Sequence, residues 1–171
     1  MNNDLYAEWL VKRKNGSKEL MIQVGLVAVA VIGILAVVLF PTWGVFIAVG
    51  AIVLAVFGFQ ALKVEYEYIF VTDELQITPI LNQQRRRNKK RVSIVMSKVV
   101  TVAPMKGHEL DPYTGNNKIN RVDFSSRMSD ANTYGIVVED KGEKTLYVIE
   151  PNEKLLNVMK NAAPRKVILT K

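Results

Sequence analysis

The sequence predicts a membrane α-helical hairpin joined to an α+β cytoplasmic domain, in which an antiparallel sheet or barrel is closed by a C-terminal helix. Residues 20–62 hold 34 apolar side chains in 43 positions and no Lys, Arg, Asp or Glu. From residue 64 onward, short runs alternate apolar and polar side chains, which is the period of a β-strand. The chain of 171 residues has a net charge of +7 and no cysteine, which excludes disulfides, thiolate metal sites and cysteine nucleophiles.

Two apolar runs, residues 20–40 and 44–62, are each long enough to cross a bilayer as a helix. They would extend roughly 32 and 28 Å, close to the thickness of the hydrocarbon core. Between them, Pro41 and Gly44 interrupt the helix, and Trp43 is predicted to be an anchor at the membrane interface. A cleaved signal peptide has a shorter apolar core, and a buried helix pair in a soluble protein keeps charge on one face. We therefore expect two transmembrane helices.

The flanking charges predict the orientation of this hairpin. Lys63 and a basic cluster follow the second run, whereas the turn around Trp43 carries no charge. The positive-inside rule then places both termini in the cytoplasm of a multi-pass protein of the inner or plasma membrane. The basic residues before the first run are Lys12, Arg13, Lys14 and Lys18.

Residues 1–19 are predicted to be a cytoplasmic or interfacial segment. Asn3 or Asp4 would cap a short amphipathic helix, and Tyr6 and Trp9 would be its membrane-interface anchors. The alternative is a frayed polar tail.

Residues 64–171 are predicted to form the cytoplasmic β domain. In the first run, Tyr66 and Tyr68 share one face, and Glu65 and Glu67 lie on the other, which we expect to be the wet face of the sheet. Pro79 has no N–H to donate, so its strand should lie at an edge or contain a bulge. A turn is expected at 72–74 and another at 140–143. The expected strands are 64–70, 75–81, 92–102, 119–125, 134–139 and 145–149.

The last predicted element is an amphipathic helix over residues 151–163. Pro151 suits its first turn, and Glu153 and Lys160 suit its positive and negative ends. Its apolar stripe should close one end or face of the sheet. Residues 165–171 would follow as an extended tail.

This order of elements resembles the pleckstrin-homology-like (PH-like) architecture. Several stretches of the chain, together with the two apolar runs, resemble a family of small bacterial two-span membrane proteins that is defined as a domain of unknown function. The resemblance implies a PH-like cytoplasmic domain and a membrane location, and it brings no reaction and no catalytic residues. The stretches are Glu8–Lys14, Val64–Phe70, Arg85–Arg91, Arg121–Ser126 and Glu150–Leu156.

The chain shows no pattern of catalytic or metal-binding residues. His108 is the only histidine and is expected in a solvated loop. Ser125, Ser126 and Ser129 have no neighbouring base in the sequence, and no glycine-rich nucleotide-binding motif occurs. The sequence thus predicts no catalytic residues, no metal and no cofactor.

The sharpest feature is a basic cluster in which six of seven consecutive residues carry a positive charge. One interpretation is a solvated turn whose charges guard against aggregation. The other is a lipid-facing surface, because the strand after Lys63 leads away from the membrane and an antiparallel strand brings the chain back. Nucleic acid is disfavoured as a partner, since no recognition motif or interleaved aromatics accompany the charges. The candidate residues for binding a lipid or another anion are Arg85, Arg86, Arg87, Lys89, Lys90 and Arg91.

From these features we expect a non-enzymatic integral membrane protein whose cytoplasmic domain interacts with an anionic lipid surface or a protein partner. A membrane-tethered enzyme or ligand-binding domain that uses the 106–118 loop is one alternative. A structural subunit of a membrane complex is the other, if glycines of the two runs pack on other helices rather than on each other. These glycines are Gly25, Gly33, Gly50 and Gly58. The sequence does not determine the oligomeric state.

Overall fold

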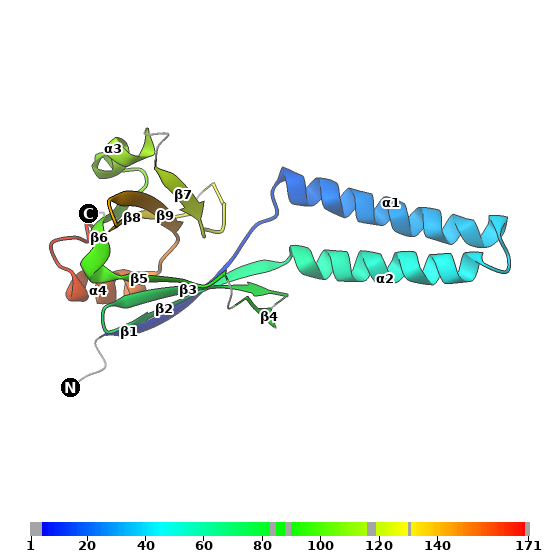
Figure 1. Cartoon of the computed structure of the whole chain (residues 1–171), viewed down its shortest axis with the longest axis horizontal. Coiled ribbons are helices and arrows are strands. Elements are labelled where there is room, and N and C mark those ends of the chain that lie inside the picture. The colour runs from blue at the N-terminus through cyan, green and yellow to red at the C-terminus, as the bar shows by residue number, and fades with distance from the viewer. Residues whose placement is uncertain (1–4, 83–84, 88–89, 116–118, 130, 170–171) are drawn as a thin grey trace. The chain divides into compact units, whose positions relative to one another are not determined.

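The computed structural model describes residues 5–82, 85–87, 90–115, 119–129 and 131–169. The chain divides into two compact units. One comprises Lys14–Val64 and Leu81–Arg85, and the other contains the remaining described residues. Figure 1 shows the two long helices of the first unit and the strands of the second.

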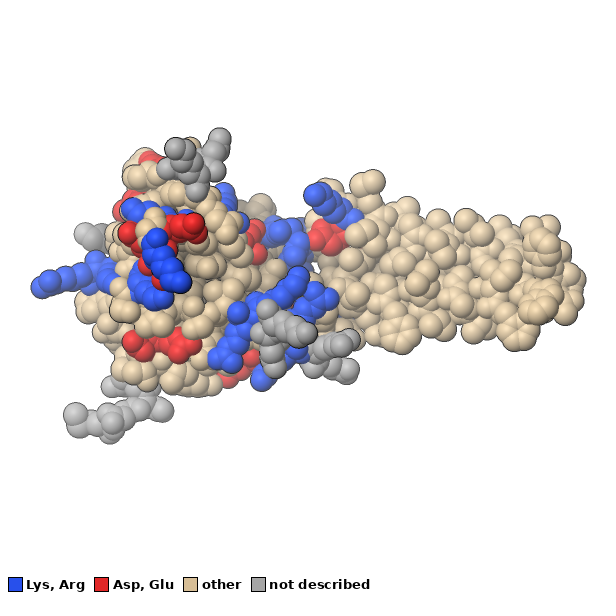
Figure 2. All heavy atoms as spheres, viewed as in Figure 1, with Lys and Arg blue, Asp and Glu red and all other residues tan. Residues whose placement is uncertain are grey.

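The first unit is built around helices α1 (Ser17–Leu39) and α2 (Gly44–Leu62). Both are long and apolar enough to cross a membrane, and α2 has the predicted bounds. At the start of α1, the backbone N–H of Gly16 donates to Oε2 of Glu19 at 3.0 Å. Residues 20–62 contain no Lys, Arg, Asp or Glu, and the face of the helices seen in Figure 2 is accordingly free of charged side chains over most of its length.

Two of the four glycines named in the sequence analysis, Gly33 and Gly58, let α1 and α2 approach each other closely. A Cβ on Gly33 would lie 2.5 Å from Cβ of Ala51, and a Cβ on Gly58 would lie 2.6 Å from Leu26. A Cβ on Gly25 or Gly50 would meet nothing within 4 Å. Gly33 and Gly58 therefore pack the hairpin on itself, whereas Gly25 and Gly50 do not.

The second unit contains two sheets. The first has the order β1-β2-β3-β4, and β5 also pairs with β3. Its strands are β1 (Tyr6–Lys12), β2 (Val64–Val71), β3 (Glu74–Leu81), β4 (Arg85–Arg86) and β5 (Val92–Val95).

Strand β1 corrects the prediction of an amphipathic helix before α1. It pairs antiparallel with β2 from Tyr6 opposite Val71 to Lys12 opposite Glu65. Ala7 and Val11 are buried on the core side. The apolar positions of this segment fit a helix and a strand almost equally well, and the pairing with β2 decides between them.

The turn between β2 and β3 lies where the sequence predicts it, with Thr72 at φ 61°. β3 is an inner strand, however, so the edge position, one of the two alternatives expected for Pro79, is wrong. Pro79 is accommodated because it lies beyond Ile77 and Val92, the last pair between β3 and β5. Its carbonyl is used as an acceptor by the backbone N–H of Arg87, at 2.8 Å.

The second sheet has the order β6-β8-β9-β7. The strand expected at 92–102 is split in two by a 3-10 turn, Met96–Lys98, after which β6 begins. β7 runs parallel to β9, so the second sheet is not wholly antiparallel as expected. Its strands are β6 (Val99–Pro104), β7 (Asn120–Asp123), β8 (Tyr134–Asp140) and β9 (Glu143–Ile149).

The C-terminal helix α4 (Glu153–Ala162) is amphipathic, as predicted. It begins two residues later than the predicted start at Pro151, because Asn152 is the N-cap and its side chain accepts from the N–H of Leu155 at 2.8 Å. Pro151 therefore precedes the helix. α4 contacts β1. The described strands form two separate sheets, so the closed barrel that we considered is not formed.

Candidate anion-binding surface

The chain returns to the end of α2 just before the basic cluster begins. Lys63 is the C-cap of α2, and β2 leads away from it. After β3, the backbone N–H of Asn82 donates to the carbonyl oxygen of Lys63 at 2.8 Å. The antiparallel return predicted from the sequence is thus confirmed. The first arginine of the cluster follows Asn82 by three residues.

The cluster runs beside the last part of β3. Arg85 and Arg86 form the short strand β4, which lies next to β3. The N–H of Arg87 bonds to the carbonyl oxygen of Pro79 of β3, and the N–H of Lys90 bonds to the carbonyl oxygen of Arg87 at 2.9 Å. The next strand, β5, begins at Val92. Arg87 thus lies beside Pro79 of β3, and Val92, which follows the cluster, lies opposite Ile77.

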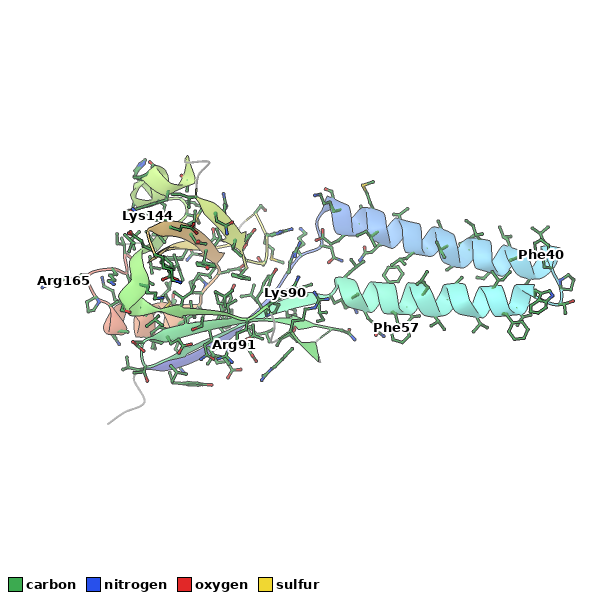
Figure 3. The ribbon with its side chains drawn as sticks, in the orientation of Figure 1. Phe40, Phe57, Lys90, Arg91, Lys144 and Arg165 are labelled. Atoms are coloured by element: carbon green, nitrogen blue, oxygen red, sulfur yellow. The ribbon has the colours of Figure 1, made fainter. Side chains whose placement is uncertain are left out.

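The described side chains of the cluster are exposed to solvent. They belong to Arg86, Arg87, Lys90 and Arg91, and Figure 3 labels the last two beside the β2–β3 region. Lys89, the fourth of the six predicted residues, lies outside the described residues.

Arg86 differs from its neighbours because it forms an ion pair with Glu67 of β2. Its Nη2 lies 2.7 Å from Oε1 of Glu67. The Arg86 side chain is 60% exposed, whereas the Glu67 side chain is only 5% exposed. This geometry is that of a charge-assisted hydrogen bond from a partly solvated guanidinium to a carboxylate that has little contact with water.

The burial of Glu67 corrects the prediction that Glu65 and Glu67 lie on a wet face. Both residues are buried, at 7% and 4% residue exposure. Leu10 and Lys12 of β1 lie directly opposite them on the same face of the sheet, and Nζ of Lys12 is 3.8 Å from Oε1 of Glu65. The sequence correctly predicted that the two acids share one face of the strand, but it did not predict that strand β1 pairs beside them. The neighbours of the two acids on this face are residues of β1 and Arg86.

The burial of Glu67 determines how firmly Arg86 is held. Loss of Arg86 would leave the Glu67 carboxylate, which is only 5% exposed, without this partner. The 60% exposure of the Arg86 side chain makes the cost smaller than for a fully buried pair.

The charge of Arg91 also acts on β3. Oε1 of Glu74 accepts hydrogen bonds from Ser93 and, at 3.2 Å, from Gln76. These bonds, with a smaller contribution from the positive charge of Arg91, lower the pKa of Glu74. Glu74 thus stays ionised beside the cluster at neutral pH.

The predicted interface anchors lie in different surroundings. Tyr6 and Trp9 are on β1, and the Tyr6 hydroxyl donates to Glu8 at 2.9 Å, which raises the pKa of Tyr6. Trp43 immediately precedes α2, and the centroid of its ring lies 6.2 Å from the centroid of the Phe46 ring. The anchor role of all three stays a prediction, and Tyr6 and Trp9 no longer have an interfacial helix to support it.

The structure describes residues 106–115 of the 106–118 loop on which the ligand-binding alternative depends. The His108 side chain is fully exposed, and its Nδ1 lies 3.2 Å from Oδ2 of Asp111. Among the residues that the structure describes, no group of three or more His, Asp or Glu side chains is arranged to hold a metal ion. Ser125 and Ser126 are buried, and the Ser125 hydroxyl donates to Asp123 at 2.7 Å.

A polar pocket that the sequence did not indicate lies between β5 and the β8–β9 hairpin. It has a volume of about 570 Å³, and Lys98 and Asp140 form an ion pair of 2.9 Å at its wall. Ser93, Thr145 and Tyr147 also line it. These residues are distributed over four elements, so no local motif could have revealed them.

Comparison with known proteins connects this fold to a family. No curated protein matches the chain. The family described as a bacterial PH-like domain (DUF6106) matches residues 3–169, which includes both apolar helices and both sheets. The resemblance noted in the sequence is confirmed, and the chain belongs to the family of bacterial PH-like domains DUF6106.

Proposed function

We propose that this protein is a non-enzymatic, cofactor-free, two-span membrane protein whose PH-like domain contacts the anionic lipid headgroups of the cytoplasmic leaflet through its basic cluster. The exposed residues Arg87, Lys90 and Arg91 are the described members of the cluster that carry this contact. Both termini would then lie in the cytoplasm, in agreement with the charges that flank the helices.

The observation that carries the proposal is the hydrogen bond between Asn82 and Lys63. Lys63 ends α2, so in a membrane it lies at the headgroup layer. Three residues of chain reach at most about 11 Å, which keeps Arg85 near that layer. This reach compares with a Debye length of about 8 Å at physiological salt and about 30 Å at ~0.01 M, so the attraction to the headgroups is partly screened at physiological salt and stronger at low salt.

The energies favour a role in orientation rather than anchoring. Three exposed basic side chains contribute about 3 kcal/mol near an anionic leaflet. Two transmembrane helices already make insertion effectively irreversible. The cluster would therefore select how the domain lies on the membrane, and a protein partner with acidic groups is the competing occupant.

The test uses the full chain in lipid nanodiscs, because β1 belongs to the same sheet as β2 and a chain cut at residue 64 loses that strand. The protein has no native cysteine, so Ser93→Cys provides a unique position for a fluorophore two residues after Arg91. Lipids with a nitroxide on the headgroup quench this fluorophore when the cluster is docked. We define the lipid preference as the ratio of docked to undocked protein in phosphatidylglycerol-containing discs, relative to discs of phosphatidylcholine alone.

We expect a lipid preference that decreases between ionic strengths of ~0.01 M and ~0.15 M. R87Q/K90Q/R91Q should abolish it, whereas R121Q/K154Q/R165Q, which removes three exposed charges elsewhere, should preserve it. A fluorophore at Asn157→Cys on α4 reports whether the whole domain or only the cluster approaches the lipid. Equal preferences for the two triple variants would refute lipid contact and direct the search to a protein partner by crosslinking in the membrane.

A further inference from the structure

We infer that Glu67 and Arg86 are positioning residues of the basic cluster, and that headgroup contact is left to its other exposed members. This inference rests on the proposed function. It divides a cluster that looks uniform in the sequence into a residue that holds the segment on the sheet and residues that face the lipid.

The contacts of Arg86 support this division. Its guanidinium bonds to Glu67 at 2.7 Å, across from β4 to β2. The next residue, Arg87, is held through its backbone to Pro79 at 2.8 Å. Arg86 is thus bound through its side chain, whereas Arg87 is bound through its main chain, and its exposed guanidinium forms no ion pair with the residues that the structure describes. Lys90 is likewise held by its backbone, through the bond to Arg87.

The burial of Glu67 keeps this pair together when a lipid approaches. A phosphate in the headgroup layer offers Arg86 an exposed, hydrated partner, whereas release of Arg86 deprives a carboxylate that is only 5% exposed of this counter-charge. A headgroup therefore recruits Arg87 before it displaces Glu67. The ion pair with Glu67 therefore fixes the position of the cluster on the sheet, and the other exposed basic side chains are left to contact the membrane.

Two double variants, each with the native net charge, distinguish the positioning arginine, Arg86, from the lipid-facing arginine, Arg87. E67Q/R86Q removes the acid and the base of the ion pair and leaves two amides that can hydrogen-bond to each other. E8Q/R87Q removes an exposed acid of the same sheet face and an arginine of the lipid-facing class. We expect E67Q/R86Q to change the lipid preference by less than twofold and E8Q/R87Q to lower it about fivefold.

Equal losses in the two double variants would overturn the inference, because Arg86 would then be a lipid contact like Arg87. This outcome is distinct from failure of the proposed function, in which R87Q/K90Q/R91Q itself has no effect on the lipid preference. In that case the positioning role is still tested by hydrogen exchange. The amide of Arg87 should exchange at least about tenfold faster in R86Q, which leaves Glu67 unpaired, and E67Q/R86Q should reverse most of this increase. No acceleration in R86Q would refute the positioning role.

Discussion

The indole Nε1 of Trp9 donates a hydrogen bond to the carbonyl oxygen of Glu150 at 3.0 Å, although 141 residues separate the two in the chain. Trp9 lies on β1, before the helical hairpin, and Glu150 follows β9, the last strand. The N-terminal strand is therefore part of the folded domain. Nearby, the N–H of Ser126 donates to Oε2 of the same glutamate at 2.9 Å, so this residue connects three segments of the chain.

Replacing Trp9 by Phe should destabilise the domain moderately. An aromatic ring is retained, but the bond to Glu150 and part of the indole's packing area are lost, which should cost at least about 0.5–1.5 kcal/mol of the free energy of unfolding. Chemical denaturation of the detergent-solubilised protein, followed by near-ultraviolet circular dichroism, measures this change. An unchanged midpoint would show that the bond contributes nothing to stability.

Tyr68 should make the domain sensitive to alkaline pH. The residue is fully buried, its hydroxyl donates to the carbonyl of Phe124 at 2.7 Å, and burial raises its pKa above the ordinary value. Because the folded state disfavours the ionised phenol, this contribution is complete below the unfolded pKa, near 10, and is progressively lost as the pH rises above it.

The corresponding measurement is the free energy of unfolding as a function of pH in the native protein and in Tyr68→Phe. We expect the variant to be less stable at neutral pH, by about 1–3 kcal/mol, and to lose less stability between pH ~9 and ~11. Parallel curves for the two proteins would exclude Tyr68 as the group responsible.

Gly33 and Gly25 should respond differently to a larger side chain. A side chain at Gly33 collides with Ala51 of α2, whereas one at Gly25 meets nothing within 4 Å. Gly33→Leu should destabilise the hairpin by about 1–3 kcal/mol or more, and Gly25→Leu should have little effect. Thermal unfolding in detergent, followed by helical circular dichroism, compares the matched pair. Destabilisation by Gly25→Leu alone would indicate that α1 packs on another helix.

The proposed orientation predicts which single cysteines are labelled from outside the cell. Thr42→Cys, between the helices, should react with a membrane-impermeant maleimide in intact bacterial cells. Asn157→Cys, on the exposed side of α4, should react only after the membrane is permeabilised. The reverse pattern would overturn the orientation, and labelling of both in intact cells would overturn the two-span arrangement.

Elements with a strong local signal were predicted well. The bounds of α2, the turns at Thr72 and at Lys141–Gly142, and the strand that became β8 follow from apolar run length, turn chemistry and alternation. The basic cluster and the return of the chain toward Lys63 also followed, because an antiparallel pair of strands of equal length brings its ends together.

Features that depend on a partner distant in the chain were missed. The segment Tyr6–Lys12 is a strand because β2 is beside it, and the run from 92 to 102 is split because the chain passes from one sheet to the other at Met96–Lys98. The buried state of Glu67 also had an available signal. An acid that alternates with apolar residues directly before a basic run was a candidate counter-charge for that run.

The amino-acid sequence by itself determined the two apolar helices, the alternating strands and the position of the basic cluster, because each depends on residues that are near one another in the chain. Only the tertiary structure decided that β1 completes the first sheet and that Arg86 is paired with Glu67 while Arg87 is not. Whether a charged side chain faces a carboxylate or solvent depends on which strands are adjacent. That adjacency arises from pairing between segments that are distant in sequence.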